Sequence, residues 1–133
     1  MSMIVEGRAI FQQIAEHVED SIIDGTLAED DQAPSTNELA AFYRINPATA
    51  AKGIALLVDK GILTKRRGIG MFVTPGARDR VLAERESAFA DAFVEPLLAE
   101  ALKLGLSVNG VIDLIRARSE RAEHPATQEG VAR

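Results

Sequence analysis

Residues 33–73 read APSTNELAAFYRINPATAAKGIALLVDKGILTKRRGIGMFV and contain a dense series of helix and turn signals. Ser35, followed three residues later by Glu38, forms a capping box that predicts the start of a short helix. Asn46 predicts a second start, because Asn caps well and the proline that follows loses no helical hydrogen bond there. Two short apolar runs then flank residues 66–70, which predicts a β-hairpin.

The segment before this stretch predicts one more helix, over residues 8–24. Its apolar residues recur every four positions, at Ile10, Ile14, Val18 and Ile22. Gly25 supplies a left-handed end to the helix. A polar connector follows, in which we interpret Asp30 and Asp31 as part of a solvated loop.

Two closely spaced helices followed by a basic-tipped hairpin predict a winged helix-turn-helix. A recognition helix needs small or polar residues in its first turn to approach base edges. Thr49 can hydrogen-bond or touch a thymine methyl, and Ala48 keeps the approach close. Lys52 suits a phosphate or a guanine, and the glycines after Arg66 and Arg67 let the hairpin turn approach the duplex.

These motifs, in this order and spacing, resemble the DNA-binding domain of GntR-type bacterial transcriptional regulators, and those of the YtrA-like subfamily in particular. The resemblance covers residues 8–75 and rests on four motifs: Pro34-Ser35 with Leu39-Ala40, Asn46-Pro47-Ala48-Thr49, Gly61-Ile62-Leu63, and Arg66-Arg67-Gly68-Ile69-Gly70-Met71-Phe72-Val73. The DNA-binding residues predicted from the motifs and the resemblance are Ser35, Thr36, Asn37, Asn46, Ala48, Thr49, Lys52, Arg66, Arg67, Gly68 and Gly70.

The sequence departs from the family pattern at Asn37, where the family usually has an arginine. Fewer phosphate contacts, or a different preferred operator, are the expected consequence. The resemblance also implies a regulator, a repressor in our interpretation, that binds double-stranded operator DNA and responds to a small molecule whose identity the residues do not give.

The second part of the chain predicts helices that pair with another copy. Residues 77–104 form a long helical pattern that Pro96 should kink or split at Glu95, and Ser107 caps a final helix. Two helices cannot bury so much apolar surface alone, which favours a homodimer on a palindromic site. The interface residues predicted are Phe89, Phe93, Leu97, Val111 and Ile115.

The predicted fold is therefore mainly α with a small β-hairpin. The predicted parts are a winged helix-turn-helix domain at 1–76, a helical dimerisation and effector segment at 77–122, and a disordered tail at 123–133.

The net charge of -5 does not by itself favour nucleic acid as a partner. The acids concentrate in residues 16–31, however, so one face can be basic while the whole chain stays acidic. The alternative hypothesis is a winged helix that has become a protein-interaction module without operator binding.

Other classes of function have little support in the sequence. No nucleophile with a base and no phosphate-binding loop emerges, so we expect no enzyme activity. The two histidines, His17 and His124, have no metal-ligand spacing, and we predict no metal and no cofactor. The absence of cysteine and of a long apolar segment favours a cytoplasmic protein without a membrane partner.

Overall fold

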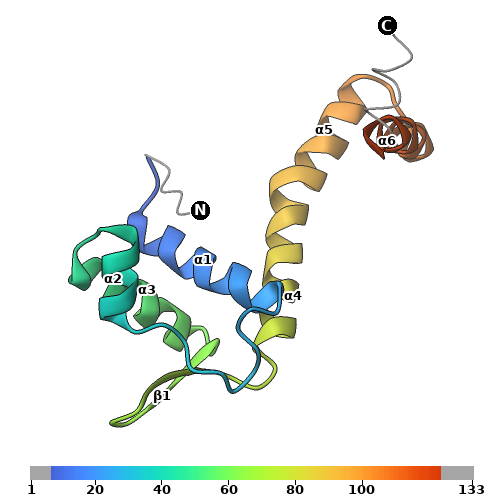
Figure 1. The fold of residues 1–133 in the computed structure, drawn as a ribbon. Coiled ribbons are helices and arrows are strands. Elements are labelled where there is room, and N and C mark those ends of the chain that lie inside the picture. The colour runs from blue at the N-terminus through green and yellow to red at the C-terminus, as the bar shows by residue number, and fades with distance from the viewer. Residues whose placement is uncertain (1–6, 124–133) are drawn as a thin grey trace, which may run out of the picture. The chain divides into compact units, whose positions relative to one another are not determined.

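The chain, in a computed structural model that describes residues 7–123, forms two compact units that divide between Glu86 and Ser87. It is mainly helical with one two-stranded antiparallel hairpin, which confirms the predicted fold class (Figure 1). The sequence placed the domain boundary at 76. Ala77 and Val81, just beyond that point, are buried in the core of the first unit.

Three helices form the body of the first unit: α1 (Ile10–Ile23), α2 (Thr36–Tyr43) and α3 (Pro47–Asp59). The predicted stripe of α1 is buried at Ile14, Val18 and Ile22, because helical spacing places these side chains on one face. Helix α3 packs closely on α1 at Gly53, where a Cβ would lie 2.9 Å from the carbonyl oxygen of Phe11.

The start of each helix in the helix-turn-helix is capped as the sequence predicts. The Glu38 amide donates to Ser35 Oγ at 3.0 Å, and the Ser35 amide donates to Glu38 Oε1 at 2.8 Å, so the capping box of α2 is complete. The Ala48 amide donates to Asn46 Oδ1 at 2.7 Å at the start of α3. These local bonds satisfy amide groups that the first turn of a helix leaves unpaired.

The hairpin pairs β1 (Leu63–Arg66) with β2 (Gly70–Val73) and projects beyond the helices of the first unit (Figure 1). The connector between α1 and α2 lies along the other edge of β2. Asp30 and Asp31 are exposed there, as predicted for a solvated loop, but the backbone of the connector also bonds to β2. The Ala33 amide donates to the Met71 carbonyl at 2.8 Å, and the Val73 amide donates to the Asp31 carbonyl at 2.9 Å. The connector therefore adds backbone hydrogen bonds to the wing, with one isolated bridge between Gln32 and Phe72, without forming a third strand.

The helical segment after the hairpin is interrupted before Pro96. Helix α4 (Ala77–Phe89) leads into a π-helical segment, η1 (Ala90–Val94), and then into α5 (Glu95–Lys103). The sequence predicted a kink or a split at Glu95, and α5 begins at that residue. Proline lacks an amide hydrogen and crowds the preceding turn, and the wider π turn accommodates both effects.

The last helix, α6 (Val108–Glu123), follows a turn at Gly105. Its start is capped as predicted, because the Gly110 amide donates to Ser107 Oγ at 3.0 Å. Within α5 and α6 only Ala101 and Val111 are buried. The predicted tail lies, from residue 124 onward, outside the described residues.

One buried carboxylate joins the three helices that surround it in the first unit. Glu19 of α1 is only 2% exposed, and its oxygens lie 2.7 Å from Lys60 Nζ and 3.3 Å from Arg85 Nη2. Lys60 caps the end of α3, and Arg85 belongs to α4. A carboxylate taken out of water is stable only with such partners, so this cluster fixes α1, α3 and α4 together.

The charge on Lys60 is stabilised by its partners. Burial alone would lower the pKa of Lys60, but the hydrogen bonds and charges of Glu19 and Glu84 outweigh burial and raise the pKa above the usual lysine value. A raised pKa in the folded state means that the stabilisation is complete at neutral pH. The stabilisation is lost only as the pH rises through the folded pKa in alkaline solution.

We predict that Lys60→Met lowers the free energy of unfolding by about 1–3 kcal/mol, because it leaves the buried Glu19 with Arg85 alone. Urea unfolding at neutral pH measures the loss, and the difference from the wild type should shrink in strongly alkaline solution. Lys65→Met, at an exposed position in the same unit, is the matched control and should change stability little. Equal unfolding midpoints for the two variants would contradict the assignment.

Candidate nucleic-acid interface

The predicted DNA-binding residues lie at three places in the first unit: the start of α2, the first half of α3, and the tip of the wing. Most of them are exposed, and only Thr36, Thr49 and Gly70 are half-buried. Helices α2 and α3 pack on each other, and the hairpin follows α3 after a turn at Gly61. The structure therefore leaves most of these residues accessible within one compact unit, and their contact with DNA stays a prediction.

The two helix starts present a small, polar surface. Ser35 and Asn46 each use a side-chain oxygen to cap a helix. Two residues after each cap, Asn37 and Ala48 are exposed. Thr49 also takes part in the first turn, where its amide donates to the Asn46 carbonyl at 2.9 Å. The absence of bulky side chains allows another molecule to approach the backbone of α3 closely.

Lys52 is not a freely extended cation. Its Nζ lies 4.3 Å from the centre of the Phe11 ring of α1, within the range of a cation–π interaction. This contact holds the charge near the surface that α1 and α3 share. No local pattern predicts the contact, because the two residues are far apart in the chain.

The wing arginines differ in their environments. The guanidinium carbon of Arg66 lies 4.0 Å from the centre of the Phe72 ring, and Nη2 lies 3.5 Å from Asp30 Oδ1. Arg67 is exposed and makes no ion pair or hydrogen bond within residues 7–123. Arg66 is thus partly neutralised by the connector, whereas Arg67 keeps its full charge at the tip.

The tip of the wing is shaped by two glycines and held by Gln32. Gly68 and Gly70 have φ values of 75° and 139°, which other residues rarely adopt. Gln32 Nε2 donates to the Ile69 carbonyl at 3.0 Å, and a Cβ on Gly70 would lie 2.6 Å from that same nitrogen. Gln32 is a positioning residue that sequence reasoning missed, because it lies far from the wing along the chain.

The predicted dimer-interface residues lie in the second unit. Phe89 and Phe93 are exposed with their ring centres 5.5 Å apart, and Leu97 and Ile115 are exposed as well. Val111 is instead buried within the unit. A cavity of about 620 Å³ between α5 and α6 is lined mainly by apolar side chains, including Leu97, Val111 and Ile115.

Neither a metal centre nor a membrane span occurs in the described part of the chain. Residues 7–123 hold no group of three or more His, Asp or Glu side chains that could bind a metal ion. His17 Nδ1 lies 3.0 Å from the hydroxyl of Tyr43, and His124 lies outside the described residues. None of the described helices is long and apolar enough to cross a bilayer.

Comparisons with known proteins agree with this geometry. Residues 10–73 match the family described as bacterial regulatory proteins, gntR family. The chain is 25% identical over 107 residues to the HTH-type transcriptional repressor YtrA of Bacillus subtilis strain 168, which covers 80% of this chain and 82% of the relative.

Solved structures of transcriptional regulators share the fold of this chain. A GntR family transcriptional regulator from Listeria monocytogenes has a TM-score of 0.67 and 26% identity, covering 86% of this chain and 98% of that one. YtrA from Sulfolobus acidocaldarius has a TM-score of 0.52 and 25% identity, covering 90% and 97%. These relatives are transcriptional regulators, not enzymes. The chain is therefore a DNA-binding transcriptional regulator, and its residues 10–73 form a winged helix-turn-helix domain of the GntR family of bacterial regulatory proteins.

Proposed function

We propose that this regulator is a homodimeric repressor that binds a palindromic operator with two winged helix-turn-helix domains. The observation that carries the proposal is the exposed surface formed by the two helix starts and the wing in the first unit. The relative from Bacillus subtilis is named a repressor, which supports the same direction of regulation here. A protein that binds bacterial operator DNA acts in the cytoplasm, the predicted location.

In the proposed complex, α3 lies in the major groove with its first turn against the bases. Ala48 allows the close approach, and Thr49 offers a hydroxyl and a methyl group to base edges. The amide groups at the starts of α2 and α3, with Ser35 and Asn46 beside them, suit phosphate oxygens. Asn37 adds a neutral hydrogen-bonding group at the position where the family pattern described above has an arginine.

The wing contributes contacts that depend little on sequence. Arg67 is exposed at the tip and can pair with a phosphate without breaking any contact within residues 7–123. To contact a phosphate, Arg66 must either give up its ion pair with Asp30 or let its guanidinium group bind both the carboxylate and the phosphate. Gly68, with no side chain, allows the turn itself to approach the duplex.

The apolar surface of the second unit supports dimerisation. Large apolar side chains are exposed along it at Phe89, Phe93, Leu97, Leu98, Leu102, Leu104, Leu106, Val108, Ile112, Leu114 and Ile115. A folded protein rarely leaves so many large apolar side chains in water, and a second copy would bury them. Two-fold symmetry then places two recognition helices on the two halves of a palindrome.

The cavity between α5 and α6 is the proposed site for a small-molecule effector. Its apolar lining and its volume of about 620 Å³ suit an organic molecule of modest size. A ligand there would lie next to the proposed dimer surface, so its binding could change how two copies pair. We propose no cofactor besides this effector.

The second candidate function, a protein-interaction module, is favoured by one observation. The chain carries a net charge of -5, and Asp30 partly neutralises the wing. A mobility-shift assay with the promoter of its own operon separates the two functions. Operator binding at low salt, where electrostatic attraction is strongest, is expected of the repressor, and no retained DNA would favour the module.

We predict that replacing Arg66 and Arg67 together with alanine weakens binding to all DNA sequences. A plot of log K against log salt concentration has a negative slope, and this slope should become less steep by about 1 for each phosphate that the variant no longer neutralises. Fluorescence anisotropy over a salt series measures both quantities. A double alanine variant at Arg116 and Arg121 of α6 removes the same charge and should leave the slope unchanged. An unchanged slope in the wing variant would refute the role of the wing.

We predict that Asp30→Asn strengthens DNA binding, because Asp30 competes with phosphate for Arg66. An exposed ion pair is worth at most about 1 kcal/mol, so the gain in affinity should be up to about fivefold. Asparagine also tolerates the backbone of this position, where φ is 70°. Anisotropy titrations of the variant in wild-type and Arg66→Ala backgrounds should show the gain only in the first.

Glu29→Gln is the matched control for Asp30, since it removes the same charge one residue away without a partner within residues 7–123. An equal gain from Glu29→Gln would mean that the net charge alone, and not competition for Arg66, sets the affinity.

We predict that the wild-type protein in solution has twice the 14.3 kDa mass of one chain. Phe93→Glu and Ile115→Glu, each made as a single variant, should lower the measured mass toward that of a monomer. Light scattering after size exclusion measures the mass. Phe42→Glu is the matched control, since Phe42 and Phe93 are 65% and 64% exposed but belong to different units. Dimers that persist in both C-terminal variants would rule out this interface.

A further inference from the structure

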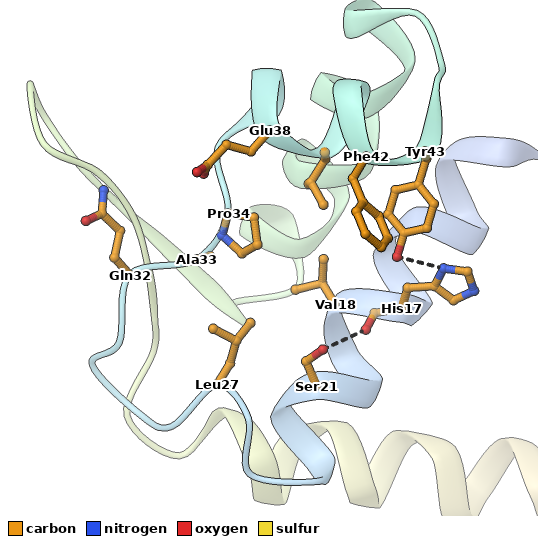
Figure 2. Close-up of a pocket in the computed structure, with 11 residues that line it drawn as sticks. His17, Val18, Ser21, Leu27, Gln32, Ala33, Pro34, Glu38, Phe42 and Tyr43 are labelled. Atoms are coloured by element: carbon orange, nitrogen blue, oxygen red, sulfur yellow. Dashed lines mark hydrogen bonds between the residues drawn. The ribbon is translucent and has the colours of Figure 1, made fainter. Parts of the chain in front are cut away.

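A second cavity lies within the first unit, between α1, the connector and α2. Its volume is about 650 Å³, and it is an open groove rather than an enclosed chamber (Figure 2). None of the predicted DNA-binding residues lines it. The DNA-binding function described above does not use this groove.

One end of the groove is aromatic. Phe42 is 65% exposed and packs edge-to-face on Tyr43, with ring centres 4.9 Å apart. The Tyr43 hydroxyl is held by His17 Nδ1 at 3.0 Å, so the orientation of the second ring is fixed. Apolar side chains, including Val18 and Leu27, continue the lining between this end and the connector (Figure 2). Such a surface favours an apolar or aromatic body of a ligand.

The charged lining of the groove is anionic. Glu38 carries the only carboxylate among its lining residues, and no lysine or arginine lines it. One oxygen, Oε1, accepts from the Ser35 amide, and Oε2 accepts no hydrogen bond within residues 7–123. Figure 2 shows Glu38 toward the side of Gln32, away from His17. A carboxylate oxygen beside an apolar surface suits a positively charged donor.

The hydroxyl of Tyr43 does not offset this charge. Burial raises the pKa of Tyr43, and the charge of Asp20 raises it further, so the phenol stays neutral at physiological pH. Asp20 itself is paired with Arg85 at 2.7 Å, so the charge that disfavours an anion in the groove is that of Glu38.

We propose that this groove binds a small organic cation, with its apolar or aromatic body on Phe42 and Tyr43 and its ammonium group at Glu38. The site is distinct from the effector cavity proposed between α5 and α6. It shares Glu38 with the capping box of α2, and it shares Gln32 with the support of the wing. Binding at this site does not depend on DNA and can be measured without it.

Three probes with one carbon skeleton test the ligand class: 4-phenylbutylamine, 4-phenylbutanol and 4-phenylbutyrate, titrated into the full chain by calorimetry. The amine should bind about tenfold more tightly than the alcohol, the gain of one charge-assisted hydrogen bond, and the anion should bind most weakly. Equal binding of amine and anion, or no binding of any probe, would overturn the proposal.

Two variants test the position of the ligand. Glu38→Gln removes the charge but keeps the capping box, which accepts glutamine as well, so α2 should remain intact. In this variant the amine should lose its advantage over the alcohol. Phe42→Ala should instead weaken both probes. Thermal unfolding confirms that each variant is folded.

Leu114→Ala, in the cavity between α5 and α6, is the control and should leave binding of the amine unchanged. If Leu114→Ala abolishes binding and Phe42→Ala does not, the cation binds in the second unit and the proposed groove is wrong. An advantage of the amine that survives Glu38→Gln would equally refute the assignment.

Discussion

The buried carboxylate of Glu19 is the constraint on which the arrangement of the first unit depends. A carboxylate in the core is costly unless cations meet it, and here the cations come from the end of α3 and from α4. The position of α3 relative to α1 is thereby fixed at its C-terminal end, while Gly53 allows close packing further along. The start of α3, which we propose faces DNA, can then remain small and exposed, because the helix is held elsewhere.

The wing depends on a second nonlocal device, the connector between α1 and α2. The connector pairs with β2 through its backbone, and Gln32 holds the tip. The same connector brings Asp30 to Arg66, so the element that shapes the wing also reduces its charge. Rigidity and electrostatic attraction to DNA therefore oppose each other at this site. Arg67 lies outside that conflict and retains its charge.

Local signals in the sequence predicted the features that local bonds create. The caps at Ser35 and Asn46 and the turn glycines of the wing need only neighbours in the chain, and their positions follow from residue type. The contacts of Lys52 with Phe11 and of Glu19 with Lys60 join distant residues, so no short pattern could predict them. Pro96 indicated a discontinuity, but whether a kink or a π turn resolves it depends on backbone geometry.

The negative net charge agrees with DNA binding once the ion pairs are placed. Acids of α1 are used within the first unit: Glu16 pairs with Arg8, and Asp20 pairs with Arg85. Lys65 and Arg67 on the wing have no acidic partner within residues 7–123. Because screening limits the range of exposed charges to about 8–10 Å, a duplex at the wing responds to these nearby cations more than to the net charge of the chain.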